Sequence, residues 1–364
     1  MKAAPRRGAT LGSERAGELY DRWDGRQGYR NGTASGYVVL GGRKVAVRRP
    51  RLVDAAGKEL PLECYAELQN PETLNSTALR KVIAGVAQRG VNGDLEQDQP
   101  LPEEQRAYGA SKSSVSRRWI AATEGTLAAQ AERRLDDRRY LAILLDGKGF
   151  ADHLLLAAMG IDEQGRKHVL GVWEGGSENA EVCGAALEDL GRRGLDVSGG
   201  VLVVLDGGKG LAAAVRTHWG DVAIVARCRV HKTRNVIKHL PKGEQRWVRA
   251  ALWQAWHEAD PGQAERDLRQ LVAELEPKWP AAAASLREGL AETLTCQALG
   301  LPLELAQALG STNLIENAFA TTESICHRVC RWRSGSQARR WATMALLKAE
   351  RGFAPVTSPA AMAA

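Results

Sequence analysis

The segment YLAILLDG, residues 140–147, and the segment VLVVLDG, residues 201–207, share one pattern. Each is a run of apolar residues that ends on an Asp-Gly pair, Asp146-Gly147 in the first and Asp206-Gly207 in the second. Short, continuous apolar runs rich in Val, Ile and Leu predict strands that are buried on both faces of a sheet. A buried strand that ends on a carboxylate can present a metal ligand, so the two runs predict a sheet that carries a cation site.

The runs that accompany these two predict a mixed sheet with helices on both faces. The expected elements are strands at 140–145, 153–161 and 167–173, a helix at 179–194, a strand at 201–205, a helix at 210–219, a strand at 222–226 and a helix at 233–240. Three strands joined as hairpins, followed by strands that helices connect, give both antiparallel and parallel pairs. This order is the one shared by ribonuclease-H-like domains, so the sequence predicts an α/β fold of that kind.

The rest of the chain divides by composition. The parts are a basic N-terminal segment at 1–70, a helical region at 71–138, the α/β domain at 139–244 and 310–351, and a helical insertion at 245–309. In the first part, Gly41-Gly42 between two β-branched runs predicts a hairpin. In the second part we expect a helix at 77–89 and an acidic, Pro-containing loop at 94–103.

Residues 108–119 predict the second half of a helix-turn-helix. A turn at Gly109 comes before a helix with small polar and basic residues, and such side chains at a helix start can contact phosphates or base edges. The candidates for DNA binding are Lys112, Ser113, Ser114, Arg117 and Arg118. An ordinary amphipathic helix with a Ser N-cap has the same pattern.

The net charge of +7 is unevenly distributed over the 364 residues. Residues 1–51 contain 12 Lys and Arg against 4 Asp and Glu, and a further Arg cluster lies between His327 and Arg340. This distribution favours a polyanion such as nucleic acid as the partner, although a basic solvated surface would give the same composition. Further candidates for DNA contact are Lys232, Arg234, Arg331 and Arg333.

Membrane and secreted classes of protein are disfavoured. The chain has no run of about 18 apolar residues, which a membrane-spanning helix needs, and no apolar region follows the basic N-terminus as in a secretory leader. The six Cys residues are scattered along the chain, which is typical of reduced thiols. We therefore expect a cytoplasmic protein with no membrane partner.

Glu316, in the segment STNLIEN at 311–317, is the candidate third acid. The polar residues that open this segment predict a helix start, which places Glu316 in the first turns of the helix. With Asp146 and Asp206, its carboxylate could hold two Mg²⁺ ions about 4 Å apart for phosphodiester chemistry, with Mn²⁺ as a substitute. The small Gly147 and Gly207, one after each Asp, would leave room for a phosphate to approach. A Glu at this position can equally offset the helix dipole, and the pattern does not separate the two roles.

Cys228-x-x-His231 follows the last predicted strand and has two side chains of metal-ligating type. The spacing is that of half a zinc site. Conceivable partners for the other half are Cys326, His327 and Cys330. The interpretation we favour instead places His231, Lys232 and Arg234 at the edge of the sheet, where they contact phosphate oxygens.

These motifs resemble those of the mutator-type transposases of bacterial insertion sequences. The resemblance runs from Arg22 to Phe353 and covers about nine-tenths of the chain. The segments that carry it are Arg22-Trp23-Asp24-Gly25 with Gly28-Tyr29-Arg30, Tyr108-Gly109 with Ser111-Lys112-Ser113-Ser114-Val115-Ser116, Leu145-Asp146-Gly147, Asp206-Gly207-Gly208-Lys209-Gly210-Leu211, Arg227-Cys228 with His231 and Arg234-Asn235, Thr312-Asn313 with Ile315-Glu316-Asn317, and Arg331-Trp332-Arg333 with Arg340-Trp341.

The resemblance implies a ribonuclease-H-like catalytic domain of the Asp-Asp-Glu type, with a helical insertion before the Glu. It makes Asp146, Asp206 and Glu316 the metal ligands, and Cys228 and His231 neighbours of the active site. It also implies double-stranded DNA as the partner, both as terminal inverted repeats and as target, and a homo-oligomer on that DNA.

The function that we expect is that of a DNA transposase, which cleaves at the ends of an element and joins a 3′-hydroxyl to a phosphodiester. Two alternatives are a ribonuclease-H-like nuclease or resolvase without strand transfer, and a catalytically inactive DNA-binding relative. Trp253 and Trp256 in the insertion either stack on unpaired bases or pack in the core of the inserted helices.

Overall fold

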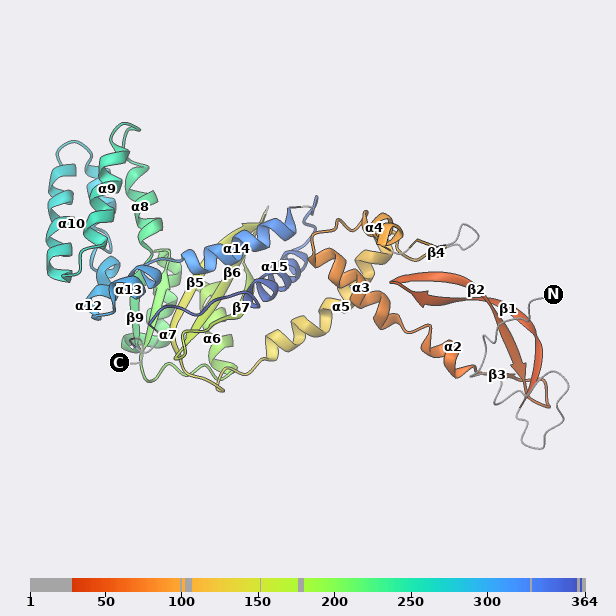
Figure 1. Ribbon diagram of the computed structural model, residues 1–364. Helices are drawn as coiled ribbons and strands as arrows, with labels where there is room; N and C mark the ends of the chain where they lie inside the picture. The colour runs from red at the N-terminus through yellow and green to blue at the C-terminus, as the bar shows by residue number, and fades with distance from the viewer. Residues whose placement is uncertain are drawn as a thin grey trace. The chain divides into compact units, whose positions relative to one another are not determined.

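The computed structural model describes residues 28–98, 100–101, 107–150, 152–175, 180–327, 329–358 and 361. The segment Arg22 to Gly25, which carries part of the resemblance, lies outside the described residues. The chain forms two compact units, Met1–Thr126 and Leu127–Ala364 (Figure 1). Within the ranges given above, no helix has the length and apolar character needed to cross a bilayer.

The first unit is built on a β-hairpin. Its strands are β1 (Tyr29–Leu40), β2 (Arg43–Val53), β3 (Glu59–Leu60) and β4 (Ala107–Tyr108). Strand β2 pairs antiparallel with each of the other three. Gly41 and Gly42, which join β1 to β2, have φ of 56° and 77°, and a two-residue turn of this kind needs the left-handed region at both positions. The predicted hairpin is confirmed, with longer strands than the sequence predicted.

Helices complete the first unit, and two of them differ from prediction. They are α2 (Glu63–Glu67), α3 (Pro71–Ile83), α4 (Val91–Asp98) and α5 (Lys112–Glu132). The loop expected at 94–103 is wrong over its first residues, because Val91 and Leu95 are buried and make this stretch the inner face of α4. Helix α3 begins earlier than expected because the Asn70 side chain accepts a hydrogen bond from the Glu72 amide, and Pro71 suits the first helical position.

The second unit contains the five-stranded mixed sheet that the sequence predicts. Its strands are β5 (Tyr140–Phe150), β6 (His153–Asp162), β7 (Lys167–Gly175), β8 (Val201–Leu205) and β9 (Ala223–Arg227). Their order in the sheet is β7-β6-β5-β8-β9. The pairs β7–β6 and β6–β5 are antiparallel, and the pairs β5–β8 and β8–β9 are parallel. The carboxyl ends of β8 and β9 therefore lie at one edge, level with Leu145 of β5.

Helices cover both faces of this sheet (Figure 1). Those beside it are α6 (Ala180–Arg192), α7 (Lys209–Trp219), α14 (Asn313–Cys326) and α15 (Gly335–Glu350). Ile143 and Leu145 share one core with apolar residues of α6 and α7. Because side chains alternate along a strand, the fully buried Ala142 and Leu144 belong to the other face. Helices α14 and α15 pack against β5, β6 and β7.

A series of helices lies between β9 and α14, and those before residue 295 share a core of their own. The series consists of α8 (Arg229–Ile237), α9 (Gln245–Trp256), α10 (Pro261–Leu275), α11 (Pro280–Arg287), α12 (Thr295–Ala298) and α13 (Leu303–Leu309), with 3₁₀ turns at Gly220–Val222 before β9 and at Ala291–Leu294. Trp256 belongs to this core and donates from Nε1 to the Thr293 hydroxyl at 3.2 Å. Trp256 therefore packs rather than stacks on bases, whereas Trp253 is 61% exposed and stacks on the His257 ring.

Candidate active site at the carboxyl ends of the central strands

Asp146 and Asp206 come directly after paired residues of neighbouring strands, but Asp146 lies within β5, which continues to Phe150, and not at its end as the sequence predicted. Leu145 of β5 lies opposite Leu205 of β8 in the parallel register, so the two Asp residues come next at the same level. Leu145 and Leu205 both point into the core with α6 and α7. The alternation of side chains then directs Asp146 to the opposite face, where α14 lies. The Asp206 carboxylate accepts a hydrogen bond from the Gly208 amide at 2.8 Å, which orients it.

Gly207 is required by its neighbour Arg227. Its φ is 101°, and a Cβ placed there would lie 2.4 Å from Arg227 Nε. Arg227 is buried and donates from Nη2 to the Gly207 carbonyl at 3.4 Å. The expectation that Gly207 leaves room for a phosphate is therefore wrong, because the guanidinium group fills that space.

Cys228 joins the sheet to helices α8 and α14. Its amide donates to the Leu205 carbonyl at 2.7 Å, next to Asp206. Its sulfur caps α8 by accepting from the His231 amide at 3.5 Å, which makes α8 begin at Arg229 rather than at 233 as predicted. The amide and the hydroxyl of Thr312, at the start of α14, both lie 3.3 Å from the same sulfur.

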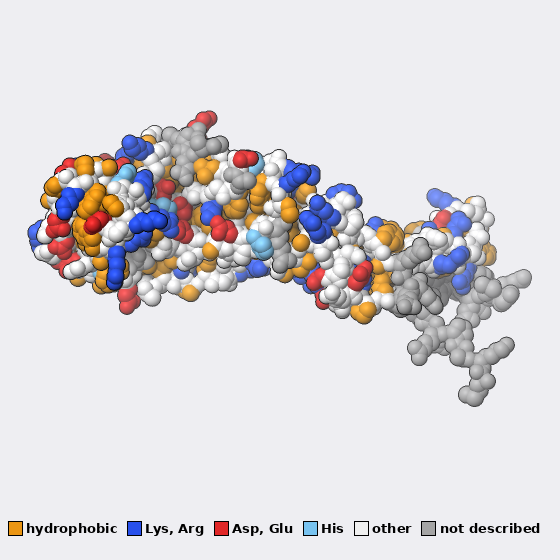
Figure 2. Space-filling model, turned by 90° about the horizontal axis from the view of Figure 1, so that it is seen from above, with side chains coloured by type: hydrophobic (Ala, Val, Ile, Leu, Met, Phe, Trp, Pro, Cys, Tyr) orange, Lys and Arg blue, Asp and Glu red, His pale blue; other side chains and the backbone are white. Residues whose placement is uncertain are grey.

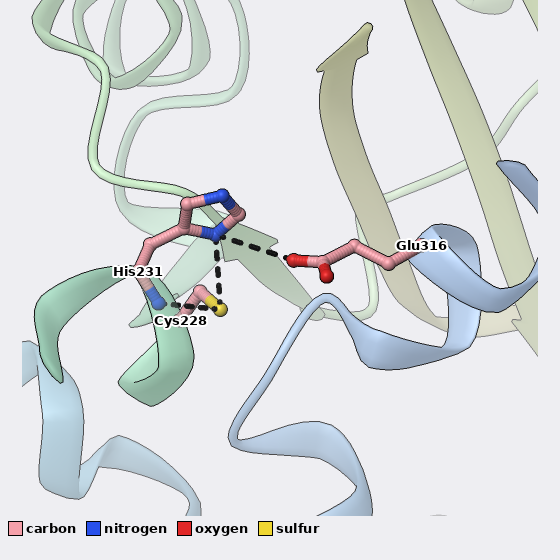
Figure 3. Close-up of side chains that lie close together, drawn as sticks. All are labelled: Cys228, His231 and Glu316. Atoms are coloured by element: carbon pink, nitrogen blue, oxygen red, sulfur yellow. Dashed lines mark hydrogen bonds and ion pairs between the residues drawn. The ribbon is translucent and has the colours of Figure 1, made fainter. Parts of the chain in front are cut away.

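Glu316 lies in the first turn of α14 and turns its carboxylate toward α8 (Figure 3). Its Oε1 atom accepts from the Thr312 hydroxyl at 3.3 Å and lies 3.7 Å from His231 Nδ1. Its Oε2 atom lies 3.5 Å from Arg234 Nη2. The side chain is about three-quarters buried. Contacts with side chains of α8 therefore fix its direction.

Asp146 is affected by the charges of both other acids. Burial is the largest cause that raises the pKa of Asp146, to about 7 in all, with His231 opposing it and the carboxylates of Asp206 and Glu316 adding to it. Asp146 is 4% exposed. Asp146 thus lies close enough to Asp206 and Glu316 for their charges to act on it, but among the described residues the ligand atoms of these three acids do not form a group within 4.8 Å of one another.

Cys228 and His231 form a coupled pair beside these acids. The hydrogen bond to Cys228 raises the pKa of His231 to about 9, with smaller contributions from Asp146 and Glu316 and with burial opposing. Burial would raise the pKa of the Cys228 thiol, but hydrogen bonds from His231 and Thr312 outweigh it and hold that pKa below its ordinary value. The imidazole is therefore a cation at neutral pH and partly offsets the charge of the acids.

Cys228 and His231 lie beside a different potential ligand from those that the half-zinc-site interpretation suggested. In the described part of the chain, Cys228, His231 and Glu316 form a group whose ligand atoms lie within 4.8 Å of one another. The proposed partners Cys326, His327 and Cys330 are not members of that group. Sequence reasoning missed this grouping because Glu316 was considered only with the two Asp residues.

The basic candidates of the second unit divide into exposed and buried side chains. Arg234, Arg331 and Arg333 are exposed. Lys232 is fully buried, and its Nζ donates to the carbonyls of Ser285 and Glu288. The expectation that Lys232 contacts DNA is therefore wrong, because its ammonium group serves to hold α8 against α11 and the residues after it.

Three of the DNA-binding candidates of the first unit, Ser114, Arg117 and Arg118, line a groove of about 440 Å³, whereas Lys112 and Ser113 lie outside it. Lys112, Ser113 and Arg117 are exposed, and Ser114 and Arg118 are half-buried. The groove is lined by Lys44, Asn75, Tyr108, Gly109, Ser114, Arg117, Arg118 and Ala121. Burial, and then repulsion from Arg117, lowers the pKa of Arg118. Sequence reasoning missed Lys44, which reaches the groove only because β2 pairs with β4.

Surface charge by itself does not mark one binding face. Figure 2 shows Lys and Arg side chains in several separate groups on the face in view, with Asp and Glu side chains between them. The groove and the acidic site are therefore defined by their local geometry rather than by a continuous basic field.

The second unit has a mixed sheet with helices on both faces and a buried Asp146 that two other acids affect, and other parts of the chain are basic. These features define the class of the protein: an α/β protein with a candidate metal centre. The family model described as "Transposase, Mutator family" matches residues 9–323. The chain therefore belongs to the Mutator family of transposases, as the sequence motifs indicated.

Relatives of known name agree with this membership. The transposase for insertion sequence element ISRM5 of Rhizobium meliloti is 30% identical, over 81% of this chain and 72% of that protein. The transposase for IS256 in transposon Tn4001 of Staphylococcus aureus is 27% identical, over 82% and 75%. The transposase for IST2 of Acidithiobacillus ferrooxidans is 34% identical, over 49% of this chain and 57% of that protein. The chain thus spans only part of each relative's length.

Proposed function

We propose that the protein is a DNA transposase that cleaves at the ends of an insertion sequence and joins a 3′-hydroxyl to a phosphodiester. The second unit would be its ribonuclease-H-like catalytic domain, with Asp146, Asp206 and Glu316 as the catalytic acids. The observation that carries the proposal is the position of Asp146, where burial and two neighbouring carboxylates raise its pKa to about 7. Family membership and the names of the relatives support the same activity.

The donor set suits a hard divalent cation. Mg²⁺ prefers oxygen ligands and needs few carboxylates when it also binds substrate phosphates. Three carboxylates, one of them desolvated, leave negative charge that a cation would neutralise. Asp146, Asp206 and Glu316 would hold Mg²⁺, with Mn²⁺ as a substitute, and the ions would activate a water or 3′-hydroxyl and stabilise charge on the phosphate.

The chain's own residues orient these ligands. Asp146 and Asp206 are fixed by the register of β5 and β8. Glu316 is held by Thr312 and His231. Arg234 is exposed beside Glu316 and could meet a phosphate oxygen of bound DNA.

The first unit would recognise the DNA of the element's ends. Helix α5 would act as the second helix of a helix-turn-helix, with Lys112, Ser113 and Arg117 on its exposed start. Arg331 and Arg333 in the second unit would add contacts to the phosphate backbone of the DNA. We further propose that the protein acts in the cytoplasm, as a homo-oligomer that holds the two terminal inverted repeats and the target duplex.

Purified protein, DNA with the element's end sequence and Mg²⁺ provide the test of this function. Joined DNA products would support a transposase. Nicked DNA without joined products would instead favour a ribonuclease-H-like nuclease or resolvase. Sequence-specific binding with neither product would favour an inactive DNA-binding relative.

A further inference from the structure

Four side-chain atoms of three elements lie close together at the starts of α8 and α14, and Figure 3 shows the side chains of Cys228, His231 and Glu316, which supply three of them. Cys228 Sγ lies 3.3 Å from His231 Nδ1, and Nδ1 lies 3.7 Å from Glu316 Oε1. The Thr312 hydroxyl oxygen lies 3.3 Å from each of these three atoms. Because it is equally distant from all three, the four atoms form the corners of a small pyramid rather than a row.

The size of this pyramid matches a tetrahedral zinc ion. Zinc is bound at about 2.3 Å by sulfur, about 2.0 Å by imidazole nitrogen and about 2.1 Å by carboxylate oxygen. A tetrahedral arrangement then separates sulfur from nitrogen by about 3.5 Å and nitrogen from oxygen by about 3.3 Å. The corresponding distances here are 3.3 Å and 3.7 Å. Side-chain shifts of a few tenths of an ångström would therefore complete the coordination.

The kinds of donor also distinguish this site from the carboxylate centre. Thiolate and imidazole favour zinc, whereas Mg²⁺ takes oxygen ligands. The sulfur already accepts bonds from the amides of His231 and Thr312, and such outer hydrogen bonds orient metal ligands and tune their basicity. Cys228 caps α8 and His231 lies in its first turn, so their relative position is fixed by the backbone.

We propose that Cys228, His231 and Glu316 bind a borderline-soft divalent cation, with Zn²⁺ as the ion of matching size. The fourth position would fall to the Thr312 hydroxyl, which lies 3.3 Å from each of the three donor atoms. Because Glu316 would serve both sites, zinc withdraws it from the carboxylate centre and inhibits Mg²⁺-dependent DNA cleavage. The binding part stands on the geometry alone, and the inhibition rests on the function proposed above.

Cobalt(II) is the probe for the binding part, because a thiolate ligand gives it an intense charge-transfer absorption. The full-length Cys330→Ser protein, which lacks the exposed cysteine, is titrated with Co²⁺ and then with Zn²⁺. We expect one Co²⁺ per chain with this absorption, displaced by stoichiometric Zn²⁺. Cys228→Ser removes the absorption, and the matched buried variant Cys326→Ser keeps it.

Two further variants keep the test decisive if Cys228→Ser does not fold. His231→Gln and Glu316→Gln change partly exposed side chains, and each should weaken Co²⁺ binding by more than about tenfold, the smaller effect typical of losing only an outer-shell partner of a metal. A wild-type titration without thiolate absorption, or an absorption that persists unchanged in the folded variants of Cys228 or His231, overturns the proposed site.

Inhibition is tested separately. With Mg²⁺ in large excess, stoichiometric Zn²⁺ should suppress cleavage of end-sequence DNA, and a chelator selective for zinc should restore it. Cleavage that stoichiometric Zn²⁺ leaves unchanged overturns the competition. Failure of the proposed function shows itself differently, as absence of cleavage with Mg²⁺ alone, and the Co²⁺ spectrum still decides whether the site exists.

Discussion

Gly207 shows how tightly the residues beside the carboxylates are packed. Its φ is 101°, and a methyl group would overlap the Arg227 guanidinium. We therefore expect Gly207→Ala to lower the free energy of unfolding by about 2 kcal/mol, from backbone strain and displacement of Arg227. Urea unfolding measures this change. The control Gly191→Ala, whose added Cβ meets nothing within 4 Å, should cost nothing, and equal losses in both variants would contradict this account.

The pKa of Asp146 predicts a dependence of stability on pH in the absence of divalent cations. Its pKa is about 7 in the fold against an ordinary 3.8, so the unfolded chain loses this proton first as the pH rises. The folded state binds more protons between these values, and this contribution to the free energy of unfolding falls as the pH rises through that window. In EDTA, the free energy of unfolding of Asp146→Asn relative to that of the wild type should therefore rise by about 2 to 3 kcal/mol between about pH 5 and pH 8.

Urea unfolding of both proteins across this pH range checks the expectation. Parallel stability curves would show that Asp146 is not desolvated as described. Added Mg²⁺ should stabilise the wild type more than Asp146→Asn, because a ligand that binds only the folded state raises its stability.

At the scale of elements, the start of α8 connects the sheet to the inserted helices. Arg229 is buried and donates to the carbonyls of Thr293 and Trp256 and to the Gln297 side chain. Arg229→Met would leave these acceptors without a partner, so we expect a loss of about 3 kcal/mol in the free energy of unfolding. Thermal and urea unfolding test this, with Arg249→Met, at an exposed position of α9, as control. Similar stabilities for the two variants would be the contrary result.

The sequence predicted those elements whose signals are local. The apolar runs before Asp146 and Asp206 predicted the central strands, and the position of each acid directly after its run anticipated the common level of the two acids. The start of α8 was missed because Cys is an unusual N-cap residue. The contact of its sulfur with Thr312, which the local sequence does not reveal, accounts for a Cys at this position. The burial of Lys232 was missed because its carbonyl partners lie more than 50 residues away along the chain.

At the scale of the whole molecule, the two units carry different candidate tasks. Lys44, Arg117 and Arg118 all line the groove of the first unit, and within the described ranges none of them forms an ion pair with an acidic side chain. Lys44→Ala and Arg118→Ala should each weaken binding of full-length protein to end-sequence DNA and lower the slope of log affinity against log salt by about one. Fluorescence anisotropy at several salt concentrations measures both quantities.

The control for this prediction is Lys58→Ala, an exposed lysine of the same unit outside the groove. It should leave the affinity and the salt slope close to those of the wild type. Equal effects of Lys44→Ala and Lys58→Ala would show that the groove has no special role in DNA binding.

Transposition of a marked element in cells tests the central claim most directly, with each acid replaced by its amide in turn. Asp146→Asn, Asp206→Asn and Glu316→Gln should each lower the frequency by more than about 100-fold, the upper effect of losing an outer-shell partner of a metal. At equal protein level, Glu304→Gln, an exposed acid of α13, should transpose like the wild type. Normal transposition by any of the three site variants would contradict the assignment of these acids as the catalytic centre.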